Sequence, residues 1–267
     1  MDLDAAARYV RTFGGPTEIA RLDRLLTGAR PEPSVVDELV GGAHSGGGWP
    51  TTWSPGAPTV EGTCLRLNQL AAFGLLDCAP ARLAVRWLVA GQLPDGRWQE
   101  DSALGDAVPS WLRPDDPAAN WYLTASAGLC VAVAAGDGRA PDAAVRAARL
   151  VGGEVSEAGT LPSFLVTHWL AAGLCWRCGD RATADRLLDR IRWPDDTLSP
   201  ADWAWCGWVL GTAGVPVEHP ASAAVREALR PTQRPDGSWP GHDGPDQDVL
   251  VTLTALATLR AAMDPAV

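Results

Sequence analysis

The chain has 267 residues and a formal net charge of −10, and these values exclude several classes of protein. With 22 basic against 32 acidic residues it offers no basic surface for a phosphate backbone, so no nucleic-acid partner is expected. No run of 18 apolar residues is present, so no membrane span is expected. The first residues lack the basic and apolar regions of a signal peptide, which predicts a cytoplasmic protein.

Composition favours one helical domain over residues 1–267. Hydrophobic residues make up 46% of the chain, enough for a large core. Ala, Leu and Arg are abundant and favour helix, whereas alternating runs of Val, Ile and Thr are scarce, so strands are not expected. The six cysteines fall mostly in apolar helical patterns and are interpreted as buried thiols. No metal and no cofactor are predicted.

Two kinds of helix alternate along the chain, after a first candidate pair at 3–13 and 16–28. Amphipathic helices, which place one face in water, are predicted at 33–43, 79–92, 140–150, 181–191 and 219–230. Helices that are apolar almost all round, and are therefore buried on all sides, are predicted at 58–76, 117–135, 161–178, 199–213 and 246–262.

Tryptophans in glycine-rich turns mark an internal repeat between the two kinds of helix. Trp49, Trp98, Trp193 and Trp239 share this context, and each is followed by a loop and an apolar helix. The gap between Trp98 and Trp193 has room for two units, so a degenerate unit is expected near residue 153, with Glu154 in place of tryptophan. Trp49, Trp98 and Trp239 are expected to have a structural role in the turns between helices.

Alternating buried and exposed helices predict an all-α fold, an (α/α)6 toroid (barrel) of inner and outer helices. An open solenoid is the alternative, but its inner helices would leave one concave face wet. A water-exposed face is not expected for residues 250–259, because their sequence is apolar.

The repeat Asp236-Gly237-Ser238-Trp239 with its following apolar helix resembles the repeat of the prenyltransferase and squalene-cyclase superfamily. Asp95–Trp98 and Gly46–Trp49 are similar, and the resemblance extends over most of residues 33–262. It implies a terpenoid-cyclase-like toroid, although related rings serve other functions.

Two signatures of the superfamily can be compared residue by residue. Class II terpene cyclases carry Asp-x-Asp-Asp-Thr with the middle Asp as the acid; the nearest match is Asp246-Gln247-Asp248-Val249, where Val249 replaces the last Asp. Asp195-Asp196-Thr197 keeps only the second half of the motif. The zinc site of prenyltransferases needs Asp-x-Cys, whereas Asp202 and Cys206 are four residues apart, so a zinc-dependent transferase is not supported.

In such a toroid the N-termini of the inner helices meet at one mouth, and polar residues of their first turns would line it. Asp246 and Asp248 are predicted as a carboxylate pair in which one pKa rises and that group donates a proton, with N-capping as the alternative. His168 is predicted as the acid/base partner, with a satisfied core histidine as the alternative. The predicted substrate-binding residues are Glu61, Asn120, Trp121, Trp169, Asp202 and Trp205.

Three functions follow as hypotheses. The first is an enzyme that cyclises or rearranges an isoprenoid or other hydrophobic small-molecule substrate, with the tryptophans lining its site and the irregular segment 99–118 covering the mouth. The second is a non-catalytic binding module or scaffold, and a second toroid or a homodimer partner is left open. A carbohydrate-active toroid ranks lowest because it would need a more polar, acid-rich lining than these inner helices offer.

Overall fold

The computed structural model describes residues 1–136, 138–192, 198–242 and 244–261. The chain divides into two compact units, one formed by residues 1–36 with 189–267 and the other by residues 37–188. The sequence predictions for Trp193, for Asp195-Asp196-Thr197 and for an accessory role of Asp243 lie outside the described residues. The prediction of a single domain stays a prediction, and each unit is described by itself.

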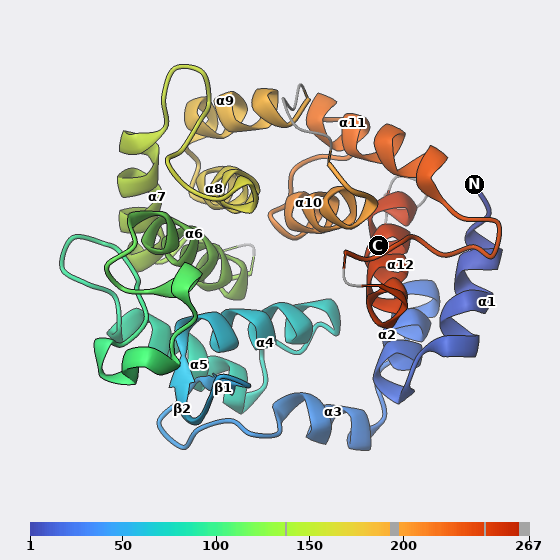
Figure 1. The fold of residues 1–267 in the computed structure, drawn as a ribbon, viewed down its shortest axis with the longest axis horizontal. Coiled ribbons are helices and arrows are strands. Elements are labelled where there is room, and N and C mark those ends of the chain that lie inside the picture. The colour runs from blue at the N-terminus through green and yellow to red at the C-terminus, as the bar shows by residue number, and fades with distance from the viewer. Residues whose placement is uncertain (137, 193–197, 243, 262–267) are drawn as a thin grey trace. The chain divides into compact units, whose positions relative to one another are not determined.

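The unit of residues 37–188 is built around one apolar helix. This helix, α6 (Pro117–Ala134), is buried along nearly all of its length and packs against α4 (Val60–Ala72) and α8 (Leu165–Arg177) (Figure 1). The amphipathic helices α5 (Ala79–Ala90) and α7 (Asp142–Glu154) also pack on α6, with polar residues turned to water. The predicted alternation of buried and exposed helices is therefore confirmed in this unit.

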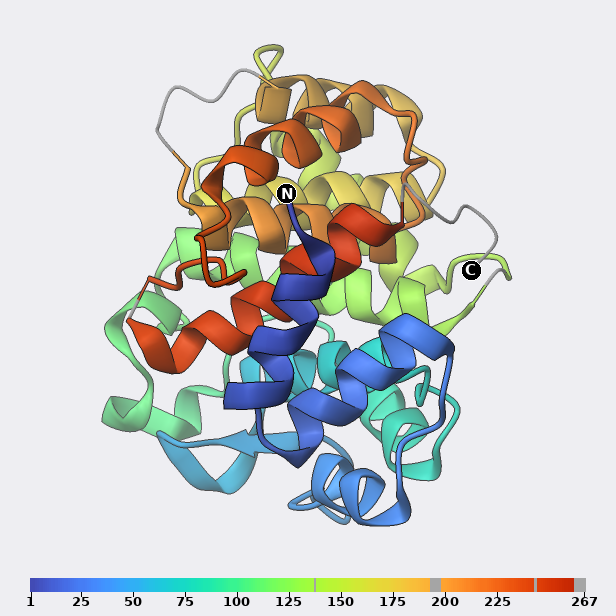
Figure 2. The same ribbon diagram turned by 90° about the vertical axis from the view of Figure 1, so that its right-hand side faces the viewer.

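The other unit also packs amphipathic helices against apolar ones. The apolar helix α12 (Pro245–Arg260) packs against α10 (Pro200–Thr212), and α11 (Pro220–Leu229) packs on both. The N-terminal helices α1 (Leu3–Phe13) and α2 (Pro16–Thr27) lie against α12, and Figure 2 shows α1 beside it. Helices α3 (Pro33–Val40) and α9 (Arg181–Arg192) cross the boundaries between the two units.

Local signals explain where the helices begin. Thr59 caps α4, Asp116 caps α6 and Ser199 caps α10, each through a side-chain oxygen that accepts from a first-turn amide. Proline at the first position of α6, α10 and α12 fixes φ without losing a needed donor. The predicted boundaries agree with the observed ones within a few residues. None of the helices in the described parts of the chain is long and apolar enough to cross a bilayer.

The irregular segments hold short elements that the sequence did not predict. A two-stranded antiparallel sheet pairs β1 (Trp49–Thr51) with β2 (Ser54–Thr59), which lead directly into α4. Short 3₁₀ helices occur at η1 (Ser102–Ala107), η2 (Ser110–Leu112) and η3 (Arg230–Thr232). Proline and glycine dominate β2, which is why its composition gave no strand signal.

Four turns between outer and inner helices share one geometry. In each, the first residue donates its N–H to the carbonyl four residues on, as Leu93 does to Arg97 at 2.9 Å. The fourth residue is a glycine with positive φ, where a side chain would be strained. The turns begin at His44, Leu93, Ser156 and Arg234, and their glycines are Gly47, Gly96, Gly159 and Gly237.

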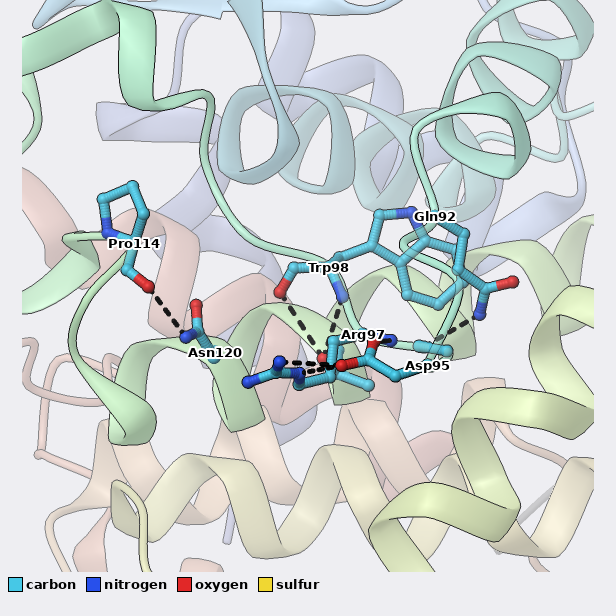
Figure 3. Close-up of polar contacts among 8 residues, drawn as sticks. Gln92, Asp95, Arg97, Trp98, Pro114 and Asn120 are labelled. Atoms are coloured by element: carbon cyan, nitrogen blue, oxygen red, sulfur yellow. Dashed lines mark hydrogen bonds and ion pairs between the residues drawn. The ribbon is translucent and has the colours of Figure 1, made fainter.

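The sixth residue of each turn ties it to the following inner helix. Trp49, Trp98 and Trp239 donate their backbone N–H at 3.0 Å to the hydroxyls of Thr63, Thr124 and Thr252, respectively. Figure 3 shows these bonds at Trp98, together with the Asp95–Arg97 ion pair of the same turn. The indole N–H of each tryptophan donates to a carbonyl of the preceding outer-helix region. The structural role predicted for these tryptophans is confirmed.

The degenerate repeat lies farther along the chain than the sequence suggested. Its turn spans Ser156–Leu161, so Leu161 holds the tryptophan position, whereas Glu154 is the last residue of α7. Leu161 donates its N–H to His168 Nε2 at 2.9 Å, so His168 takes the place of the threonine. The prediction near residue 153 was wrong because the tryptophan, its main marker, is replaced by an ordinary apolar residue.

In two of these turns a glutamine connects the turn to the next outer helix. Gln92 donates to the carbonyls of Gly96 and Ala143, both at 2.9 Å, and so holds its turn against the start of α7 (Figure 3). Gln233 makes the equivalent bonds to Gly237 and Asp2, and Asp2 N donates back to it at 2.7 Å. Helix α1 therefore serves as the outer helix that follows α12, which supports the predicted first pair.

We expect Thr124→Val to lower the free energy of unfolding by about 2 kcal/mol. Valine keeps the shape of threonine but leaves the buried Trp98 N–H without its acceptor, and such orphaned groups cost about 1–3 kcal/mol. Denaturant unfolding measures the change. Thr212→Val, at the last position of α10, is the control and should cost far less; equal costs would contradict the role of the turn bond.

Candidate active site

Glu61 is a buried acid in the first turn of α4. Its side chain is 6% exposed, although the surrounding residues of this turn are apolar or small. Gly62 follows it, and a Cβ there would lie 2.8 Å from the Trp49 carbonyl, so only glycine lets the β1 segment approach this closely. The β1 segment therefore packs closely against the first turn of α4, in which Glu61 is buried.

Tyr122 on α6 holds one oxygen of this acid. Its hydroxyl donates to Glu61 Oε1 at 3.0 Å. Both residues precede the turn-binding threonine of their helix by two positions, Thr63 in α4 and Thr124 in α6, so they occupy equivalent places on adjacent inner helices. Among the described residues, Glu61 Oε2 has no hydrogen-bond partner and is enclosed. The carboxyl therefore has one oxygen fixed and one unpaired.

Burial controls the protonation of this carboxyl. Desolvation raises the pKa of Glu61 to about 7, the Tyr122 hydrogen bond lowers it in part, and the charge of Glu100 raises it further. The pKa of Tyr122 is also raised, by its own burial and by Glu61, so the tyrosine stays a donor. A carboxyl with a pKa near neutrality holds a proton in much of the population and can deliver it as a general acid.

Aromatic rings surround Tyr122. Trp111 in η2 and Phe164, which precedes α8, contact it edge-on, with ring centroids at 6.3 and 6.1 Å. Trp111 is 47% exposed although its neighbour Leu112 is fully buried. The π-faces of such rings attract cations and pack well against apolar chains, so this cluster suits a hydrophobic molecule that carries positive charge.

The face of α4 that bears Glu61 continues as an exposed apolar surface. Leu65 lies one helical turn after Glu61, on the same side, and is 48% exposed. The buried acid therefore lies one helical turn before an exposed leucine on the same side of α4.

Two of the residues predicted as catalytic, His168 and Asp248, form hydrogen bonds with backbone groups of the turns. His168 is buried, accepts the Leu161 N–H through Nε2, and places Nδ1 3.3 and 3.2 Å from the carbonyls of Phe164 and Leu165. Because Nε2 accepts, the ring proton belongs on Nδ1. This is the satisfied core histidine that the sequence left open as an alternative.

Asp248 is likewise engaged at both oxygens. Oδ1 accepts from the Gly241 amide at 2.7 Å, and Oδ2 forms an ion pair with Arg234, the first residue of the preceding turn. Asp246 lies on the exposed side of the first turn of α12, whereas Asp248 is 2% exposed. The two carboxyls therefore face different surroundings, and their geometry favours the stabilisation of the turn and the helix end.

The predicted binding residues differ in their burial and in their hydrogen bonds. Asn120 donates to the Pro114 carbonyl at 2.9 Å (Figure 3), and its own carbonyl oxygen is buried without a partner in the described structure. Trp169 is fully buried, which argues for core packing, while Trp121 and Trp205 are half-buried. Asp202 forms a capping box with Ser199 and contacts His242 Nε2 at 3.2 Å.

Of the predicted site residues, one lies in the cluster around Tyr122. Glu61 joins Tyr122, Phe164 and Trp111, of which only Glu61 was singled out for a binding role. Asp246, Asp248, Asp202 and Trp205 belong to the other unit. Within the described ranges, no group of three or more His, Cys, Asp or Glu side chains is arranged to hold a metal ion.

We expect Asp248→Asn to destabilise the protein by about 1–2 kcal/mol and to leave turnover within a few-fold of the parent. The amide keeps an acceptor for Gly241 but loses the charge that faces the half-exposed Arg234. Urea unfolding and a turnover assay measure the two effects. Asp246→Asn is the matched control and should change neither by much; a large loss of turnover in Asp248→Asn alone would restore Asp248 as the acid.

No protein-family model and no curated protein matches this chain. Solved structures do match. A variant of the type II terpene cyclase MstE from Scytonema, in complex with its substrate geranylgeranyl dihydroxybenzoate, has a TM-score of 0.60 at 15% identity, over 96% of this chain and 95% of that one. Another variant with the product merosterolic acid A has a TM-score of 0.58 at 15% identity, over 97% and 95%.

A protein from Actinoplanes matches to a similar degree, with a TM-score of 0.59 at 18% identity, over 98% of this chain and all of that one. The chain therefore has the fold of a terpenoid cyclase. The predicted fold class, an all-α toroid of inner and outer helices, is confirmed by these matches together with the helical content. At this identity the likeness shows the fold alone.

Proposed function

We propose that this protein is a terpene-cyclase-like enzyme that protonates and cyclises a hydrophobic, prenyl-bearing substrate, with Glu61 as the acid. The observation that carries the proposal is the buried carboxyl of Glu61, which has one oxygen held by Tyr122, the other unpaired and its pKa raised to about 7. The neighbours in fold support the substrate class, because MstE binds geranylgeranyl dihydroxybenzoate.

The chemistry follows from the arrangement of the two oxygens. Tyr122 donates to Oε1, so the acidic proton belongs on Oε2, the oxygen without a partner in the described structure. Oε2–H adds its proton to an alkene carbon, and the remaining alkene carbon becomes a cation. An internal double bond of the same chain attacks that cation and closes a ring, and loss of a proton from carbon to a base ends the reaction. The product is an isomer of the substrate, and water returns the proton to Glu61.

The surroundings suit such a cation. Rings of Trp111, Tyr122 and Phe164 offer π-faces, each able to stabilise a nearby cation by about 0.5–2 kcal/mol. The exposed Leu65 continues the same face of α4 and would contact the hydrocarbon chain. Asp246, Asp248 and His168 remain alternatives from the sequence, but the bonds of Asp248 and His168 favour structural roles.

The experiment is turnover of geranylgeranyl dihydroxybenzoate and of linear polyprenyl compounds in H₂O and in D₂O, with products analysed by mass spectrometry. A cyclised isomer of unchanged mass is expected in H₂O, and the same product one mass unit heavier in D₂O, with the deuterium on carbon. Cyclised product without deuterium would exclude protonation as the first step. Failure to convert any prenyl substrate, with tight binding retained, would favour the alternative of a non-catalytic binding module.

A further inference from the structure

We propose that Glu100 is a positioning residue that keeps Glu61 in its uncharged, proton-donating form by occupying the amide end of α4. The inference rests on the proposed function for its catalytic meaning, although the protonation of Glu61 can be measured without any substrate. Glu100 lies two residues after the turn tryptophan Trp98, at the start of the segment that leads to η1.

The carboxyl of Glu100 binds the start of α4 through both of its oxygens. Oε2 accepts from the Val60 amide at 2.8 Å and Oε1 from the Glu61 amide at 2.9 Å. The next amide, of Gly62, donates to Thr59 Oγ1 at 2.9 Å. The free donors of the first turn are therefore taken up by an acid that is itself 1% exposed, an unusual place for a carboxylate unless it is paired in this way.

An acid in the first turn of a helix is ordinarily favoured as an anion. Unpaired amides and the positive end of the helix dipole stabilise negative charge there, which would lower the pKa of Glu61 and make it a poor proton donor. Glu100 removes this stabilisation, because its carboxylate occupies the amides and adds a negative charge beside them. Burial is the main cause of the raised pKa of Glu61, and the charge of Glu100 raises it further.

The two acids thus have different environments at the same helix end. Burial has the largest effect and leaves the pKa of Glu100 raised, although the two amide hydrogen bonds lower it in part and the charge of Asp101 raises it further. Glu61 receives no such amides and has only the Tyr122 hydroxyl as a donor within the described structure. The hydrogen bonds therefore distinguish the two carboxyls, because the two backbone amides bound by Glu100 favour its anionic form.

The other ionisable groups near Glu61 do not supply the negative charge that Glu100 places beside it. On α4 itself Cys64 is buried and Arg66 is half-buried, and α6 contributes Tyr122 and Cys130; the pKa values of Cys64 and Tyr122 are raised, so these two side chains stay neutral at ordinary pH. The strands β1 and β2 carry no ionisable side chain. Helix α5 also packs on α4, but its Arg82 and Arg86 are exposed to water. Glu100 is therefore a charged group held directly against the start of α4, beside Glu61.

The test compares Glu100→Gln and Glu100→Asp with the parent. The protonated carboxyl of Glu61 is followed against pH by infrared spectroscopy, and its band is assigned by its loss in Glu61→Gln. We expect the titration midpoint to fall by about one pH unit in Glu100→Gln, which removes the charge. In Glu100→Asp the retracted carboxylate reaches one amide only, so the midpoint should fall by less. Glu157→Gln, on an exposed turn, is the control and should leave it unchanged.

A midpoint that stays in place or rises in either folded variant would overturn the inference. If Glu100→Gln does not fold, as judged by circular dichroism, Glu100→Asp decides alone. The pH profile of turnover provides a second readout, because its loss at high pH should move down with the same midpoint. If the parent converts no prenyl substrate while the infrared midpoint shifts as expected, the proposed function fails and the positioning role of Glu100 stands.

Discussion

Glu61→Gln should reduce kcat for a prenyl substrate by about 10³-fold while changing substrate affinity by only a few-fold. Glutamine has the size of glutamate and can still accept the Tyr122 hydroxyl, but its amide has no proton acidic enough to add to an alkene. General acids contribute about 10²–10⁴-fold to rate, so loss of the sole proton donor is expected to reach this range. Single-turnover kinetics with product analysis measures the change.

Two further variants make this result specific. Glu61→Asp keeps a carboxyl but withdraws it by one methylene from Tyr122 and from the substrate, so we expect partial activity between that of the parent and Glu61→Gln. Glu154→Gln changes an exposed glutamate at the end of α7 and should leave turnover unchanged. Turnover in Glu61→Gln within three-fold of the parent would remove Glu61 as the acid and return attention to Asp248.

The helices could be predicted because their signals are local. The apolar stretch of α6, the Asp116-Pro117 start and the glycine turn at Gly96 each act within a few residues of the feature they determine. The position of the degenerate turn was not predicted because Leu161 is an ordinary apolar residue. Leu161 resembles Trp98 only in that its backbone N–H donates to a side chain of the following inner helix.

The site could be predicted only in part, because it depends on the register between helices. Glu61 was recognised as a polar residue near the start of an inner helix, but not as the acid. Its protonation depends on Tyr122 and Glu100, which lie 61 and 39 positions away in sequence. One signal was available: Glu61 and Tyr122 each precede a threonine of an apolar helix by two positions. Asp248 drew attention through its motif, whereas its partner Arg234 could be identified only from the fold.

Glu61 should make the protein less stable as pH rises from about 4.5 to 7, and Glu61→Gln should remove this contribution. The folded state raises the pKa of Glu61 from its ordinary value of 4.5 to about 7, chiefly through burial. Between these values the folded chain holds a proton that the unfolded chain has lost, so the unfolded state binds fewer protons and stability declines with pH. Below pH 4.5 both states are protonated and the effect vanishes.

The size of the effect follows from the shift. Each unit of pKa corresponds to about 1.4 kcal/mol, so a shift of this size amounts to about 3 kcal/mol above pH 7. Relative to the parent, Glu61→Gln should gain about that much stability between pH 4.5 and 8, as measured by urea unfolding across the pH range, while Glu154→Gln follows the parent. If Glu61 is a buried catalytic acid, Glu61→Gln should be inactive and yet more stable than the parent at pH 8. The reason is that the burial which makes Glu61 a proton donor also destabilises the folded state once the proton is lost. A parallel pH dependence in Glu61→Gln and the parent would show that the carboxyl is ionised in the folded protein, and the proposed acid would then have no proton to give.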